Sequence, residues 1–216
     1  MSVKISVCVP SIRPQYLNIT QECLEKQTFT DFEVLWEIGL RNQGFTLPSD
    51  MNKMLRRAKG ERIVILQDCI RVGGNALERI NNLSNDMWTF PVGQTDDFES
   101  ENTEWDWRKT YTDGELPGAH YWETDFGCAP KKAFFDIGGY DEDFNNGWSW
   151  DNVEVARRMY RAGYKGYLEP TICGLALRHD KIIDHPFRGT RELNDKRAER
   201  SKYRCDRGDY LLPYLD

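Results

Sequence analysis

The sequence lacks any apolar run approaching the ~20 residues that a membrane-spanning helix needs. It also lacks an excess of positive charge, because 29 Lys and Arg residues stand against 35 Asp and Glu residues and the formal net charge is -6. Such a chain has no broad basic surface for a phosphate backbone or an anionic membrane. We therefore expect no membrane span, and nucleic acid is possible but disfavoured as a partner.

Closely spaced cysteine pairs are missing as well. No two cysteines stand as Cys-x-x-Cys, and several lie in apolar runs, which favours buried, reduced thiols over a disulfide framework. The six cysteines are Cys8, Cys23, Cys69, Cys128, Cys173 and Cys205. The first residues begin directly with a strand pattern and show no signal peptide. These features predict a soluble protein of the cytoplasm.

Strand and helix patterns alternate three times within the first 70 residues. Residues 4–9, 32–38 and 62–66 have the apolar character of buried strands, and amphipathic stretches lie between them. This alternation favours right-handed β-α-β units and a mostly parallel sheet flanked by helices. At 216 residues, the chain is predicted to form a single α/β domain around one core.

Polar residues follow each of these three predicted strands. Ligands of open α/β sheets bind beyond the carboxyl ends of the strands. We therefore expect Pro10-Ser11, Glu37 and Asp68 to lie along one crevice. The alternative is that Pro10 and Gly39 only make strand-ending turns, which any α/β protein has.

A second cluster of chemistry-bearing residues follows Gly-Gly-Tyr-Asp-Glu-Asp-Phe at residues 138–144. It reads Gly-Trp-Ser-Trp-Asp-Asn-Val-Glu over residues 147–154, and apolar residues at spacings of three to four predict a helix from Asp151 onward. A spacing of three places Asp151 and Glu154 on one helix face. Two carboxylates beside tryptophans suit a sugar-handling site. Alternatively, Asp151 is simply the N-cap of its helix.

These motifs, in their order along residues 3 to about 180, resemble GT-A-fold glycosyltransferases of the family 2 type, with a galactosyltransferase-like C-terminal segment. The resemblance implies a GT-A (Rossmann-like) single domain. Its nucleotide-binding half would cover about residues 1–92, its acceptor and catalytic half about 93–185, and a charged tail 186–216. It further implies hexosyl transfer from a nucleotide-diphosphate donor, with a UDP-sugar favoured, to a glycan or another hydroxyl acceptor.

The resemblance places the donor at the strand ends. Pro10 and Ser11 would contact the nucleobase through their backbone, and Glu37 would accept a hydrogen bond from base or ribose. The full set of implied nucleotide-sugar-binding residues is Pro10, Ser11, Arg13, Glu37, Asn52 and Asp68.

The implied cation site departs from the family pattern. The third strand of such enzymes usually ends in Asp-x-Asp, whereas Gln67 and Cys69 here flank a lone Asp68. His179 lies in a run that resembles a galactosyltransferase segment with a metal-binding histidine, and His185 competes with it. Asp68 and His179 are therefore the implied ligands of Mn²⁺ or Mg²⁺ in a weakened site. Alternatively, Arg or Lys side chains hold the phosphates.

For catalysis, the resemblance implies that Asp151 is the general base. Trp148 and Trp150 would stack on the acceptor, and Glu154 would help to bind it. Inversion is slightly favoured over retention, because the same segment also resembles retaining polypeptide GalNAc-transferases. The galactosyltransferase pattern has Glu-Asp where this chain has Asp151-Asn152, so the position of the base could be offset by one residue.

Two stretches have less definite readings. Residues 93–121 show no periodicity, and we interpret them as a loop that is either an acceptor-side flap or an ordinary exposed surface. The basic tail favours a solvated helix, although its arginines would also suit a donor diphosphate, and its last aromatic and apolar residues suggest an anchor on the core or a partner subunit. Two rival functions remain: a catalytically inactive sugar- or nucleotide-binding protein, and a viral-type glycosyltransferase that modifies DNA bases.

Overall fold

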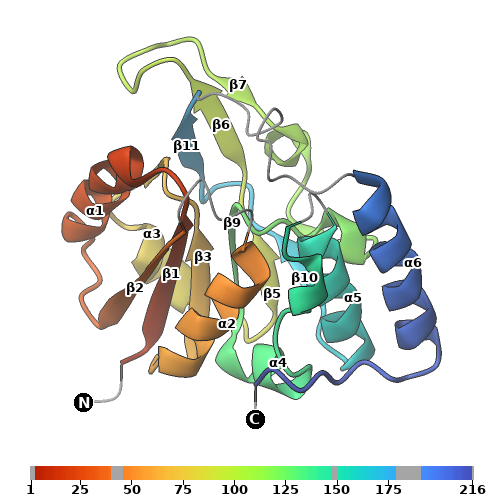
Figure 1. The fold of residues 1–216 in the computed structure, drawn as a ribbon. Helices are drawn as coiled ribbons and strands as arrows, with labels where there is room; N and C mark the ends of the chain where they lie inside the picture. The colour runs from red at the N-terminus through yellow and green to blue at the C-terminus, as the bar shows by residue number, and fades with distance from the viewer. Residues whose placement is uncertain (1–2, 40–45, 147–149, 179–190, 216) are drawn as a thin grey trace.

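The computed structural model describes residues 3–39, 46–146, 150–178 and 191–215. In this part of the chain the strands form two sheets (Figure 1). The larger sheet has seven strands in the order β2-β1-β3-β9-β5-β10-β8, and the smaller has four in the order β4-β11-β6-β7. No helix among the described residues combines the length and the apolar character that crossing a membrane requires.

The N-terminal half of the large sheet is parallel, as the alternating pattern predicts. Strand β1 lies between β2 and β3, so that Cys8 has Leu35 and Ile65 as its neighbours in register. Helix α1 connects β1 to β2, and α2 connects β2 to β3. The bounds are β1 Ile5–Ser11, α1 Leu17–Glu25, β2 Phe32–Ile38, α2 Leu47–Arg57 and β3 Arg62–Leu66.

Strand β9 breaks the parallel pattern, because it runs antiparallel to both β3 and β5. Strand β10 is parallel to β5, and β8 is antiparallel to β10. Five of the seven strands described in this sheet therefore run in one direction, and the mostly parallel sheet is confirmed. The bounds are β5 Met87–Thr89, β8 Gly114–Glu115, β9 Phe126–Pro130 and β10 Gly166–Leu168.

The core has two parts, one on each face of the large sheet. Successive strand residues point to opposite faces, so Val64 and Ile65 of β3 belong to different clusters. Helices α2, α4 and α5 supply apolar residues to one cluster, and α1 and α3 supply them to the other. The bounds of the remaining three helices are α3 Ala76–Asn81, α4 Lys131–Asp136 and α5 Asp151–Arg161.

All six cysteines are free, and five of them are buried, which confirms the prediction of buried thiols. Burial raises the pKa of the Cys8 thiol to about 12 and that of Cys69 to about 11. Both groups are therefore uncharged at neutral pH.

The prediction that residues 93–121 form a loop is wrong. This stretch holds three short strands and two 3-10 turns, and β6 joins β11 and β7 in the small sheet. Two of its strands have only two residues, too few for alternation to be visible in the sequence. The bounds are β4 Ile70–Val72, β6 Val92–Thr95, β7 Glu104–Trp105, η3 Trp107–Thr110, η4 Ala119–Tyr121 and β11 Gly174–Leu177.

The C-terminal tail begins with α6 (Arg191–Asp206), which lies beside α5 (Figure 1). Its arginines hold acids of the turn before α5: Arg200 Nη2 lies 2.7 Å from Asp143, and Arg204 Nη2 lies 2.8 Å from Asp141. In the structure, these two arginines thus pair with acids of their own chain. Beyond the helix, Tyr210 packs against the core, and the Leu212 amide donates to the Ile137 carbonyl at 3.0 Å, although Leu211 is 67% exposed.

Candidate active site

The ends of β1 and β3 meet at a buried carboxylate. The Ser11 hydroxyl donates to Asp68 Oδ2 at 2.5 Å, and Arg13 Nη2 donates to Asp68 Oδ1 at 2.8 Å. Arg13 Nε donates to Oδ2 at 3.4 Å, and the Arg13 amide donates to Ser11 Oγ at 3.0 Å. Asp68 is 1% exposed and Arg13 5%. Two of the residues expected along one crevice, Ser11 and Asp68, are thus in direct contact, and Arg13, an implied donor residue, joins them.

One nitrogen atom of the Arg13 guanidinium takes no part in these hydrogen bonds. Its Nη1 atom is buried and finds no hydrogen-bond partner among the described residues. A buried donor without a partner costs about 1–3 kcal/mol. The guanidinium is therefore held by Asp68 on one side and has donor capacity in reserve on the other.

Pro10 and Glu37 lie at the same edge of the sheet, since they are partners in the β1–β2 register. The Glu37 carboxylate is 2.9 Å from Arg57 Nη2. The Gly39 amide donates to the Ser11 carbonyl at 2.7 Å, which closes the turn after β2. Of the six implied donor residues, Ser11, Arg13 and Asp68 are thus in contact, and Pro10 and Glu37 lie at the neighbouring strand ends.

Asn52 is the sixth, and it has a different task. Its side chain is fully buried on α2 and clasps Tyr140: Nδ2 donates to the Tyr140 carbonyl at 3.0 Å, and the Tyr140 amide donates to Oδ1 at 2.8 Å. Nδ2 also donates to Glu142 at 2.9 Å. Because these bonds occupy the amide, Asn52 holds the Gly-Gly-Tyr turn in place, and its implied contact with the donor is not supported.

Asp151 is the first residue of α5 and is 8% exposed. The N-cap position belongs to Trp150, whose φ of 75° is left-handed, so Asp151 is the first helical residue and not the N-cap itself. Burial raises the pKa of Asp151 to about 6, while the backbone N–H groups of residues 151 and 152 favour its charged form. A carboxylate in this state is suited to accept a proton near neutral pH.

The aromatic side of this segment is partly described. Trp150 Nε1 donates to Asp195 of α6 at 2.8 Å, and the Arg157 guanidinium lies 5.7 Å from the centre of its ring. Trp148 lies outside the described residues. Trp150 is therefore tied to α6, and its stacking on an acceptor stays a prediction.

Glu154 faces the interior. Its carboxylate accepts from Arg158 Nη2 at 2.5 Å, from Ser201 at 3.1 Å and from Arg204 at 3.4 Å, and it is 1% exposed. Arg158 also donates to the carbonyls of Ile137 and Gly139. Although the predicted helical spacing from Asp151 is present, these contacts argue against Glu154 as an acceptor-binding residue.

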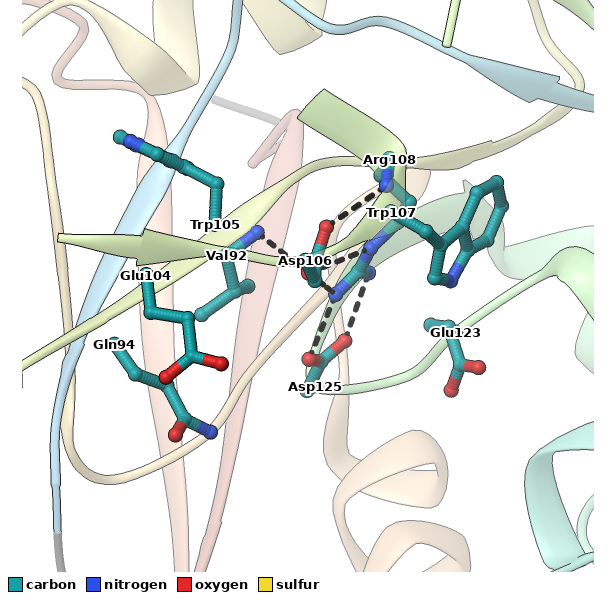
Figure 2. A pocket seen from close by; sticks show the side chains of 9 residues that line it. All are labelled: Val92, Gln94, Glu104, Trp105, Asp106, Trp107, Arg108, Glu123 and Asp125. Atoms are coloured by element: carbon teal, nitrogen blue, oxygen red, sulfur yellow. Dashed lines mark hydrogen bonds and ion pairs between the residues drawn. The ribbon is translucent and has the colours of Figure 1, made fainter. Parts of the chain in front are cut away.

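A cavity of about 380 Å³ lies between the small sheet and the segment that leads into β9 (Figure 2). It is lined by Val92, Gln94, Glu104, Trp105, Asp106, Trp107, Arg108, Glu123 and Asp125. None of these residues was singled out as a site residue from the sequence. The signal that points to them is the mixture of acids and tryptophans in a stretch without periodicity.

Arg108 organises the cavity wall. It is 2% exposed and binds Asp125 through two bonds of 2.9 Å each, while its Nε donates to Asp106 at 3.0 Å. A further bond of 3.0 Å reaches Thr89 of β5. Burial by itself lowers the pKa of Arg108, but the two neighbouring carboxylates together outweigh it and raise that pKa, because they stabilise the charged guanidinium. The guanidinium is thus saturated by the wall itself.

Glu123 joins the cavity to α5. Asn152, the residue after Asp151, donates from Nδ2 to Glu123 Oε2 at 2.8 Å. Burial, reinforced by the charge of Asp125, raises the pKa of Glu123 to about 7, against the opposing effects of Arg108 and Asn152. The start of α5 and the cavity are therefore parts of one site.

The described residues do not fit a divalent cation. They contain no group of three or more His, Cys, Asp or Glu side chains that could hold a metal ion. Both Asp68 oxygens are engaged by Ser11 and Arg13, and the neighbouring Cys69 thiol is uncharged. His179 and His185 lie outside the described residues. The implied site for Mn²⁺ or Mg²⁺ is thus not formed by the residues described.

The strand order, the reversed β9 and the site at the strand ends define the class: the chain has the GT-A glycosyltransferase fold. Among solved structures it is similar to S. aureus TarS 1-349 in complex with UDP-GlcNAc, with a TM-score of 0.63 and 12% identity over 84% of this chain and 60% of that one. The UDP complex gives a TM-score of 0.60 at 12% identity, over 81% and 60%.

This chain therefore spans about 60% of the length of the TarS 1-349 chains that it matches. No protein-family model and no curated protein matches the sequence.

Proposed function

We propose that this protein transfers a sugar from a nucleoside-diphosphate donor to a hydroxyl acceptor. The observation that carries the proposal is the cluster of Ser11, Arg13 and Asp68 at the ends of β1 and β3. It lies in a fold shared with TarS, of which complexes with UDP-GlcNAc and UDP are known. Ligands of open α/β sheets bind at such strand ends. A UDP-linked sugar is accordingly the favoured donor.

At the site for the nucleotide-sugar, Arg13 supplies the hydrogen-bond donors. Arginine matches phosphate oxygens in pairs and keeps its charge at any ordinary pH. Asp68 and Ser11 fix the guanidinium, so its free Nη1 is the group that we assign to the diphosphate. The leaving nucleoside diphosphate carries negative charge, and a fixed donor aimed at that charge lowers the barrier to departure.

On the acceptor side, a carboxylate takes the proton of the attacking hydroxyl as the sugar centre becomes oxocarbenium-like. Base catalysis of this type contributes about 10²- to 10⁴-fold. Asp151 is the candidate base that the resemblance implies, with inversion slightly favoured, and its raised pKa and its place at the start of α5 suit the task. Glu123 is a second candidate, because it lines the cavity while Asp151 is nearly covered.

The donor site is tested by calorimetric titration with UDP, using the wild type, Asp68→Ala and Ser11→Ala. Ser11→Ala removes one bond to Asp68 and leaves the Arg13 ion pair in place. Glu192→Ala, which removes an exposed carboxylate of α6, is the control. We expect the control to bind UDP like the wild type and the two site variants to bind at least about tenfold more weakly, which is 1.4 kcal/mol.

If UDP does not bind, the diphosphates of guanosine, cytidine and thymidine are tested in turn. Failure of all four contradicts the proposal. Circular dichroism of each variant separates a lost binding site from a lost fold.

An inactive sugar- or nucleotide-binding protein is the alternative that a specific observation favours, because the lone Asp68 is fully engaged within the chain. Slow release of UDP from a UDP-sugar by the wild type, with water as acceptor, contradicts this alternative. A nucleic-acid acceptor is tested by a gel-shift assay at low and moderate salt, because such binding weakens as salt rises.

A further inference from the structure

Four carboxylates line the cavity, and three of them are paired with arginines. Asp106 and Asp125 bind Arg108, and Glu104 lies 3.2 Å from Arg178 Nη2. Glu123 stands apart from the ion pairs in Figure 2, and its hydrogen-bond partner is the neutral amide of Asn152. Glu123 is thus the one acid of this cavity that forms no ion pair with another described residue.

We propose that Glu123 contacts the acceptor hydroxyl and takes its proton, and that Asn152 positions Glu123 for this step. The inference rests on the proposed function. The acceptor O–H bond breaks and its proton passes to the Glu123 carboxylate. The acceptor oxygen bonds to the anomeric carbon as the bond from that carbon to the diphosphate oxygen breaks, and the electron pair leaves with the nucleoside diphosphate.

Access favours Glu123 over Asp151. The oxygen of a general base must come within about 3 Å of the hydroxyl oxygen whose proton it takes. Glu123 lines an open cavity, whereas Asp151 is 8% exposed at the start of α5. The two lie in one site, because Asn152 follows Asp151 directly and bonds to Glu123.

The cavity also indicates the class of acceptor. Its volume of about 380 Å³ falls within the range of small-molecule pockets, roughly 300–1,000 Å³. Trp107, 36% exposed, offers an aromatic surface, and Gln94 and the paired carboxylates offer hydrogen-bonding groups. Such a lining suits a neutral, hydroxyl-rich molecule such as a saccharide.

The groups around Glu123 hold its pKa near neutral pH. Asp125 and Asp106 face it with negative charge and favour its protonated form, whereas Arg108 and the Asn152 amide favour the charged form. On α5, the acid next to Asn152, which donates to Glu123, is Asp151. A base acts in its charged form, so the rate should rise with pH through about 7, the pKa of Glu123.

The test measures UDP release from UDP-GlcNAc, UDP-GalNAc, UDP-glucose and UDP-galactose, with water as acceptor, between about pH 5 and about pH 9. Glu123→Gln is compared with Asp151→Asn, at the other candidate base, and with Glu192→Gln, which removes an exposed carboxylate of α6. We expect Glu123→Gln to lower the rate at least about 100-fold with UDP affinity unchanged, Asp151→Asn to lower it less, and Glu192→Gln to leave it unchanged.

Asn152→Ala supplies a signature that a merely structural role would not give. Its amide lowers the pKa of Glu123, so removing it should move the rising limb of the pH profile to higher pH. This variant also keeps the inference testable if Glu123→Gln does not fold.

The outcomes separate the two claims. If Asp151→Asn abolishes UDP release and Glu123→Gln does not, the role of Glu123 is refuted while the proposed function stands. An unmoved pH profile in Asn152→Ala refutes the positioning role. A wild type that releases no UDP from any of these donors contradicts the proposed sugar transfer, and the inference falls with it.

Discussion

Arg13 and Asp68 form a buried ion pair, with 2.8 Å between Arg13 Nη2 and Asp68 Oδ1, across 55 residues of sequence. The pair ties the turn after β1 to the end of β3. The resemblance implies two carboxylates for a cation at this strand end. The charge that faces Asp68 therefore comes from the chain itself.

The first prediction concerns metal binding. Because Ser11 and Arg13 engage both oxygens of Asp68, we expect Mn²⁺ to bind weakly and UDP affinity to change less than about threefold between Mn²⁺ and a chelator. Electron paramagnetic resonance of Mn²⁺ and calorimetry with UDP measure the two effects. Arg13→Gln, which frees an oxygen of Asp68, should bind Mn²⁺ more tightly. Strong binding by the wild type would contradict this account.

The second prediction is that Glu154 acts in stability. Glu154→Ala leaves the buried Arg158 without its carboxylate, and breaking a buried pair in this way costs about 3–5 kcal/mol. Urea unfolding measures the loss. Glu192→Ala is the matched control, because it removes a carboxylate at the same helical spacing from an exposed lysine, Lys196, and should change little. Equal effects of the two variants would disprove the buried role.

The third prediction tests the contact between the Gly-Gly turn and the C-terminal segment. A Cβ on Gly138 would lie 1.6 Å from the Leu212 carbonyl oxygen, at a φ of +74°. Gly138→Ala should therefore displace the C-terminal anchor and lower the melting temperature. Gly163→Ala is the control, since Gly163 also has a positive φ but no atom within 4 Å. Its loss of about 1–2 kcal/mol reports backbone strain alone. An equal loss of stability in both variants would contradict this prediction, because it would show that the Leu212 backbone moves aside at no cost.

The fourth prediction follows from the raised pKa of Asp151, about 6 in the folded protein against 3.8 as its ordinary value. Between these values the folded state binds a proton that the unfolded state has lost, so this group makes stability fall as pH rises from about 4 to 6. Asp151→Asn removes the effect. We expect the variant to gain up to about 3 kcal/mol over the wild type at pH 8, and much less at about pH 4. Urea unfolding at these two pH values measures the gain in stability. A gain that does not depend on pH would contradict a raised pKa of Asp151 as its cause.

Much of the fold was accessible from local patterns. The predicted strands at residues 32–38 and 62–66 coincide with β2 and β3, because an apolar run between turn signals needs no distant partner to be recognised. The short strands β7 and β8 could not be recognised in this way. Strand β8 pairs with β10, which lies far along the chain, and β7 pairs with the preceding strand β6 over only two residues.

For the candidate site too, some features follow from the sequence and others only from the tertiary structure. The sequence by itself determined which groups the chain carries to the strand ends and to the start of α5, including Ser11, Arg13, Asp68 and Asp151. Only the tertiary structure decided that Asp68 is held by Arg13, and that Glu123 meets Asn152 across 29 residues. The reason is physical: the chemistry of a carboxylate depends on its burial and on the charges within a few ångströms, and both are set by packing.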